Sequence, residues 1–122
     1  MINNQSIIDS FRVAFQGIYY ALKFNRNIRI HFIAAFLVII ASIYFKVNAF
    51  EMGILGVMIL LVICTEMINT AIEEMVNLLI NEHRQEAKIA KDVSAGMVLL
   101  TALGSVIVGI LVFIPHIIKL LK

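Results

Sequence analysis

The feature that most constrains the fold is an uncharged run, Met52 to Thr65, that continues directly into a polar stripe. At 100° per residue, the polar side chains of the following segment fall within roughly a third of a helix circumference. They are Glu66, Asn69, Thr70, Glu73 and Asn77. Ionisable groups on an otherwise apolar helix are costly and tend to face the interior of a bundle. The stripe is therefore a candidate functional site on a membrane-spanning helix.

The composition is that of an integral membrane protein. Hydrophobic residues make up 61% of the 122 residues and charged residues 15%. In a soluble domain about half of the residues are apolar and about a quarter are charged. This length predicts a single domain, residues 1–122, with about three spans. The net charge of +2 gives no argument for a nucleic-acid partner. The single cysteine, Cys64, excludes an intramolecular disulfide, and we expect it to pack in the bundle.

Hydrophobic periodicity predicts an all-α chain with one surface helix and three spans. Apolar residues recur every three or four positions after a capping Ser6, which predicts an amphipathic helix over about 6–23 on the membrane surface. Packing of this helix on a partner subunit is the alternative. The spans are expected over about 30–47, 50–80 and 93–118. The second, roughly 45 Å long, exceeds the ~30 Å hydrocarbon core, so its last turns should project from the membrane. The polar loop 81–92 can continue as helix in its second half.

The distribution of Lys and Arg predicts the orientation. Four of these residues precede His31 and three lie in the loop 81–92, against three on the other side, Lys46, Lys119 and Lys122. The positive-inside rule then places the N-terminus and this loop in the cytoplasm, in a multi-pass protein of the cytoplasmic membrane. The polar stripe should face the cytoplasmic leaflet, where ATP is available.

The residues at this interface suit phosphoryl transfer. Carboxylates such as Glu73 at the water edge can hold Mg²⁺, and Lys91 can pair with a phosphate. A partly desolvated Glu66 can take a proton from a hydroxyl group. Together they favour transfer from Mg-ATP to a lipid alcohol, although no P-loop or protein-kinase motif is present. Intramembrane carboxylates also serve ion and proton pathways, so these residues alone leave transport as an equal alternative.

Four segments resemble the signature of the small prokaryotic diacylglycerol kinase family, which includes undecaprenol kinases. They match in order and spacing over nearly the whole chain: Ser10-Phe-Arg-x-Ala-Phe-x-Gly17, Arg29-Ile-His31, Glu66-x-x-Asn69-Thr-Ala-Ile-Glu73 and Ala87-Lys-Ile-Ala-Lys91-Asp92. The resemblance implies a lipid kinase that uses Mg-ATP on diacylglycerol or undecaprenol. It also implies a homotrimer with active sites between subunits.

The resemblance further implies a role for each matching residue. Glu66 would bind the lipid hydroxyl and act as its base, and Asn69 would support it. Glu73 would hold the metal and the nucleotide. Three residues of the following segment would lie at the nucleotide: Glu82, Lys91 and Asp92. Arg29 is a candidate to bind a lipid phosphate or a nucleotide, with a positive-inside anchor as the plainer alternative, and His31 is expected to be an interfacial anchor.

One departure from the family pattern bears on the expected metal site. The family usually has a glutamate before Arg-Asn-x-Arg-Ile-His that shares the metal with the carboxylate at Glu73, and here that position is Asn25. An amide oxygen ligates weakly, so Asn25 stays a doubtful metal and nucleotide ligand, and we expect weaker Mg²⁺ binding or a lower rate. The departure also keeps open a non-catalytic or transport oligomer that retains the fold.

Overall fold

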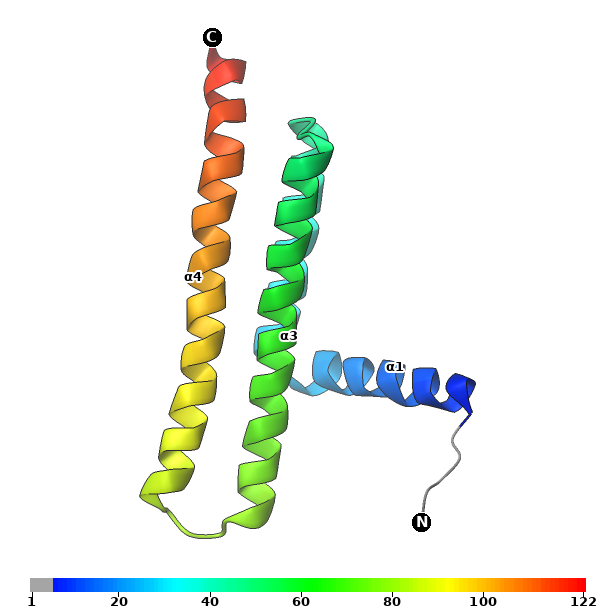
Figure 1. Ribbon diagram of the computed structural model, residues 1–122, viewed down its shortest axis with the longest axis vertical. Helices are drawn as coiled ribbons and strands as arrows, with labels where there is room; N and C mark the ends of the chain where they lie inside the picture. The colour runs from blue at the N-terminus through cyan, green and yellow to red at the C-terminus, as the bar shows by residue number, and fades with distance from the viewer. Residues whose placement is uncertain (1–5) are drawn as a thin grey trace.

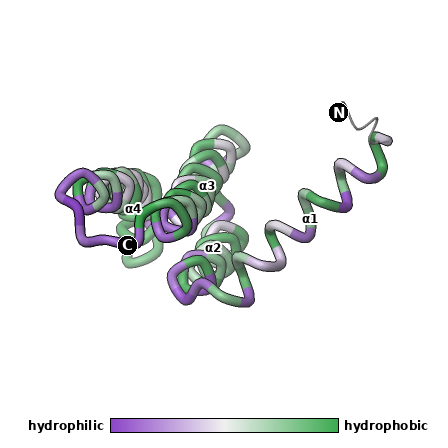
Figure 2. Tube along the Cα trace, turned by 90° about the horizontal axis from the view of Figure 1, so that it is seen from below, coloured by the Kyte–Doolittle hydropathy of each residue, from purple (hydrophilic) through white to green (hydrophobic). Residues whose placement is uncertain are grey.

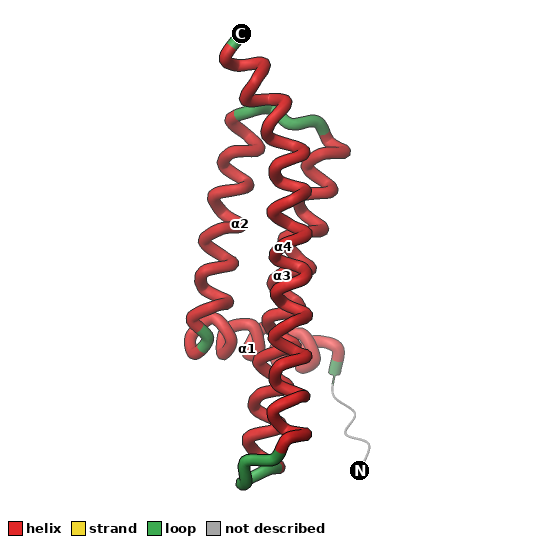
Figure 3. Tube along the Cα trace, turned by 90° about the vertical axis from the view of Figure 1, so that its left-hand side faces the viewer, coloured by secondary structure: helices red, strands yellow, loops and turns green. Residues whose placement is uncertain are grey.

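The computed structural model describes residues 6–122, which form four α-helices and no strand. The helices are α1 (Ile7–Phe24), α2 (Arg26–Tyr44), α3 (Ala49–Leu79) and α4 (Gln85–Leu121). α2, α3 and α4 run along the long axis of the molecule, and α1 leaves sideways (Figures 1 and 3). Each of the three long helices is apolar and long enough to cross a membrane. The predicted all-α membrane fold, with a surface helix and three spans, is confirmed.

α1 is an amphipathic helix that barely contacts the rest of the chain. Ser6 caps it, since its Oγ accepts a hydrogen bond from the backbone N–H of Asp9 at 3.2 Å. Ala21 is its only buried residue. Large apolar side chains such as Phe11 and Phe15 stay exposed, as expected for a helix that lies on a lipid surface.

A single residue turns the chain from α1 into α2. Asn25 has an extended backbone, and its Oδ1 accepts from the backbone N–H groups of Asn27 at 2.8 Å and Ile28 at 3.2 Å. Arg29 donates from Nη1 to the carbonyl oxygens of Leu22 at 3.2 Å and Lys23 at 2.7 Å. Helix termini leave unsatisfied backbone groups. Here the side chain of Asn25 binds N–H groups at the start of α2, and Arg29 binds carbonyl groups at the end of α1.

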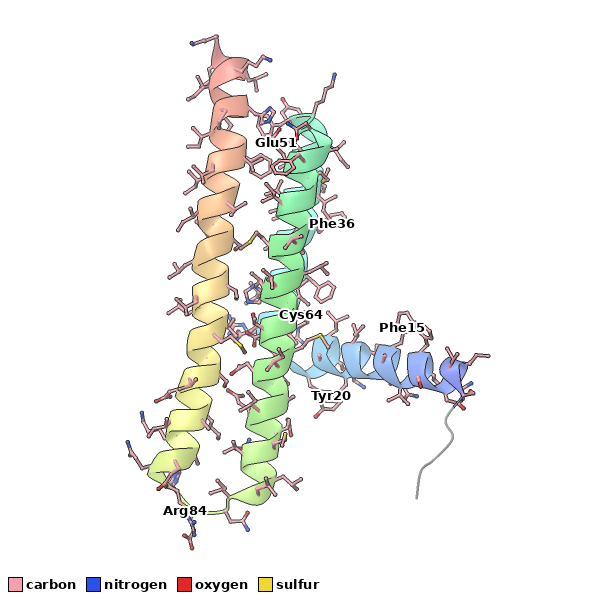
Figure 4. The ribbon with its side chains drawn as sticks, in the orientation of Figure 1. Phe15, Tyr20, Phe36, Glu51, Cys64 and Arg84 are labelled. Atoms are coloured by element: carbon pink, nitrogen blue, oxygen red, sulfur yellow. The ribbon has the colours of Figure 1, made fainter. Side chains whose placement is uncertain are left out.

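The far ends of the spans meet through Glu51. Asn48 and Glu51 form a capping box at the start of α3, which satisfies two unpaired backbone donors. The Glu51 carboxylate also lies 3.0 Å from His116 Nε2 of α4. Glu51 thus ties α4 to the end of the bundle that carries the α2–α3 connection (Figure 4).

α3 and α4 are antiparallel neighbours joined by a short turn. α4 begins at Gln85, so the second half of the loop 81–92 is helical, as the sequence allowed. In mid-span Thr65 and Thr101 share a hydrogen bond of 2.9 Å, and Gly104 brings Met58 close, as small residues do between membrane helices. Hydrophobic residues dominate the spans, and hydrophilic ones gather at the α3–α4 turn (Figure 2). Cys64 is exposed on α3, so the expectation that it packs is not met within one chain.

Candidate active site

Glu66 is a buried carboxylate at the point where α3 passes the α1–α2 corner. Only 2% of the surface of Glu66 is exposed. Asn25 Nδ2 donates to Glu66 Oε1 at 3.3 Å and also to Thr70 Oγ1. His31 Nε2 lies 4.0 Å from Glu66 Oε2, beyond hydrogen-bond distance. One carboxylate oxygen is therefore held by an amide, and the other faces a histidine that the sequence had suggested only as an anchor.

A cavity of about 290 Å³ surrounds this carboxylate, and we call it the corner cavity. It brings together four of the predicted site residues. Its lining comprises Tyr20, Ala21, Phe24, Asn25, Arg26, Asn27, Glu66, Asn69, Thr70, Glu73 and Glu74. Tyr20 reaches it from the underside of α1 (Figure 4). Arg29 is not part of the lining, because its guanidinium group is turned to the end of α1. The corner cavity can hold a polar headgroup beside Glu66.

Asn69 is held in place by Ser94, a residue outside the motifs of the sequence. Ser94 Oγ donates to Asn69 Oδ1 at 2.6 Å and lies 3.0 Å from the carbonyl oxygen of Lys91. Both Ser94 and Asn69 are buried. With its oxygen bound to Ser94, the amide group of Asn69 has its two N–H donors left for the corner cavity. The feature of the sequence that could have indicated this contact is the position of Ser94, one helical turn after Lys91 at the start of the third span.

A second cavity, of about 420 Å³, lies at the α3–α4 turn, and we call it the turn cavity. It contains the other predicted nucleotide residues. Its lining comprises Val76, Asn77, Ile80, Asn81, Glu82, His83, Arg84, Gln85, Ala87, Lys88, Lys91 and Asp92. Arg84 marks this end of the molecule in Figure 4.

The two lysines of the turn cavity have different partners, since Lys88 pairs with a carboxylate and Lys91 with a neutral amide. Lys88 Nζ lies 2.6 Å from Asp92 Oδ2, and this hydrogen bond, followed by the charge of Asp92, raises the pKa of Lys88. Lys91 Nζ instead donates to the amide oxygen of Asn77 at 2.6 Å. The positive charge of Lys91 is thus oriented without being neutralised, as a phosphate contact requires.

Within one chain the predicted site is divided between two cavities. Asn25, Glu66, Asn69 and Glu73 line the corner cavity, whereas Glu82, Lys91 and Asp92 line the turn cavity. Among residues 6–122, no residue lines both cavities. The contacts of Ser94 with Asn69 and with the Lys91 carbonyl group connect them through α4.

The residues present suit a magnesium ion that arrives with phosphates. In the part of the chain that the structure describes, no three or more His, Cys, Asp or Glu side chains cluster as a metal site would require. The oxygen of Asn25 already accepts two backbone hydrogen bonds, which argues against the doubtful metal role predicted for it. Glu73 is exposed in the corner cavity. Mg²⁺ commonly takes one or two carboxylates together with substrate phosphates and waters, so Glu73 fits.

Comparisons with known proteins agree with the motifs. The model of the family described as prokaryotic diacylglycerol kinase matches residues 12–113. A diacylglycerol kinase of Synechocystis sp. is 38% identical over 117 residues, which are 95% of this chain and 67% of that protein. An undecaprenol kinase of Bacillus subtilis is 37% identical over 106 residues, 87% of this chain and 86% of that protein.

Proposed function

Since the chain belongs to the prokaryotic diacylglycerol kinase family and is a lipid kinase rather than a transport protein, we propose that it transfers the γ-phosphate of Mg-ATP to the hydroxyl group of undecaprenol or diacylglycerol. The observation that carries this proposal is the buried Glu66 carboxylate beside a cavity that a lipid headgroup can enter. A carboxylate positioned in this way accepts the proton of an attacking hydroxyl group.

The proposed mechanism assigns one task to each group. Glu66 takes the proton from the acceptor hydroxyl, and Asn69 orients the headgroup through its free N–H donors. Lys91 binds the transferred phosphoryl group, and Glu82 and Asp92 lie at the nucleotide beside it. Glu73, together with the ATP phosphates, would hold Mg²⁺, which supplies charge neutralisation when it is bound.

We propose further that the active sites lie between the subunits of a homotrimer, on the cytoplasmic side of the membrane. In the described part of one chain, the corner and turn cavities share no lining residue, which supports a site completed by a neighbouring subunit. Many large apolar side chains of α2, α3 and α4 are exposed in the isolated chain, so subunit contacts as well as lipid can cover them. The excess of Lys and Arg before His31 and in residues 81–92, at the α3–α4 turn and the start of α4, supports the orientation.

Purified protein in detergent micelles is expected to transfer labelled γ-phosphate from ATP to undecaprenol and so to form a lipid phosphate. Undecaprenol is tested first because the chain covers more of the undecaprenol kinase than of the diacylglycerol kinase, 86% against 67%. Diacylglycerol is assayed in parallel, and the ratio of the two kcat/KM values assigns the acceptor. ATP hydrolysis without a phosphorylated lipid, or no ATP consumption with either alcohol, would contradict the proposal.

Asn25→Glu is expected to lower the Mg²⁺ concentration needed for half-maximal activity by about tenfold, because it adds a second carboxylate beside Glu73 and affinity for such cations follows ligand charge. Asn25→Gln is the matched control. Glutamine has the same length as glutamate and also replaces the short side chain that caps α2, but it adds no charge. The measurement is the rate at saturating ATP as a function of Mg²⁺. If Asn25→Glu and Asn25→Gln need the same Mg²⁺, position 25 does not reach the metal.

A further inference from the structure

We propose that Asn25 is a positioning residue for Glu66, which it holds through an amide donor, rather than a weak substitute for a metal-binding carboxylate. This inference rests on the proposed function, because it assumes that Glu66 is the base. It assigns a role to Asn25, which the sequence left as a doubtful metal ligand, and it is argued from the contacts at the α1–α2 corner.

The orientation of the Asn25 amide group is fixed by the backbone of α2. Its Oδ1 accepts from the N–H groups of Asn27 at 2.8 Å and Ile28 at 3.2 Å. These partners are donors, so only the oxygen of the amide can face them. The NH₂ group must then point the other way, toward α3. Asn25 therefore presents a donor, and not an oxygen ligand, to the corner cavity.

The donor meets Glu66 and the residue one turn after it. Asn25 Nδ2 lies 3.3 Å from Glu66 Oε1 and also donates to Thr70 Oγ1. Thr70 Oγ1 in turn donates to the backbone carbonyl of Glu66 at 2.9 Å. Among the described residues Asn25 is the only hydrogen-bond donor to this buried carboxylate. The contact that holds the α1–α2 corner against α3 is thus made at Glu66, the proposed catalytic base.

This contact determines which oxygen of Glu66 remains available. Oε1 is bound to Asn25, whereas Oε2 has no hydrogen-bond partner in residues 6–122 and lies 4.0 Å from His31 Nε2. Oε2 is then the oxygen that accepts the hydroxyl proton. A second carboxylate at position 25 would face Glu66 as a like charge, whereas the amide attracts it. The amide therefore orients the base without competing for its proton.

Asn25→Asp tests this role directly. Aspartate caps a helix as well as asparagine does and has nearly the same shape, but it replaces the donor by a charged oxygen that faces Glu66. We expect kcat to fall by at least about tenfold, because a misplaced reacting group is costly. The KM for ATP and the Mg²⁺ concentration for half-maximal activity should stay at their wild-type values. Asn25→Ser, which caps α2 without a charge and is too short to reach Glu66, should give a smaller loss of kcat.

Asn48→Asp provides the matched control, because Asn48 caps α3 at the opposite end of the bundle and its replacement should leave kcat unchanged. Wild-type kcat in both Asn25→Asp and Asn25→Ser would overturn the inference and leave the proposed function intact. A lower Mg²⁺ requirement in Asn25→Asp would also overturn it, because a side chain as short as that of asparagine would then reach the metal, whereas the longer side chain of Asn25→Glu is needed for that contact here. Absence of transfer by the wild-type protein would instead overturn the proposed function.

Discussion

Replacement of Glu66 by glutamine is expected to lower kcat by about 10²- to 10⁴-fold, the usual contribution of a positioned general base. Glutamine keeps the size of the side chain but cannot take a proton from the acceptor hydroxyl group. The KM for ATP should stay near its wild-type value, because the proposed phosphate contacts lie at the turn cavity and not at Glu66. Single-turnover transfer to the lipid acceptor at saturating ATP measures the chemical step directly.

Glu51→Gln is the matched control for this prediction. Glu51 lies on the same helix as Glu66, but it caps the N-terminal end of α3 and contacts His116. It makes no contact with either cavity, so its replacement should leave kcat unchanged. Wild-type activity in Glu66→Gln would show that Glu66 is not the base, and a loss of similar size in Glu51→Gln would show that the assay reports general damage to the fold.

Most of the fold could be predicted from the sequence because hydrophobic periodicity and capping residues are local signals. Ser6 was expected to cap the first helix and does so, and the second span was expected from about residue 50, close to the start of α3 at Ala49. The predicted third span began at residue 93, whereas α4 begins at Gln85. Hydropathy detects only the apolar part of a helix, and the polar first turns are stabilised instead by contacts such as the pair between Lys88 and Asp92.

The candidate site was only partly predictable. The polar stripe of α3 follows from the period of a single helix, so Glu66, Asn69 and Glu73 could be grouped from the sequence. The contacts of Asn25 and Ser94 depend instead on how α2 and α4 are rotated against α3, and no local pattern specifies that rotation. The same limit applies to His31, which shares no spacing motif with Glu66 although it lies beside it.

An active site shared between subunits can be tested by mixing two inactive variants in one preparation. Glu66→Gln removes the proposed base in the corner cavity. Lys91→Met removes the proposed phosphate contact in the turn cavity and keeps a long, unbranched side chain without the charge. Each variant alone should form inactive trimers. When the two are mixed in equal amounts and allowed to exchange subunits, about a quarter of the wild-type activity should return, as expected for random assembly of a symmetric ring.

The recovery follows from the separation of the two cavities. If each site takes Glu66 from one subunit and Lys91 from its neighbour, a site is intact whenever a Lys91→Met subunit supplies the base and a Glu66→Gln subunit supplies the lysine. A mixture of Glu66→Gln with Asn69→Ala is the control, because both residues line the corner cavity of the same chain and no combination restores a complete site. No recovery in the first mixture, with subunit exchange verified by a fluorescent label, would mean that each chain completes its own site and that the cavities join without a neighbour.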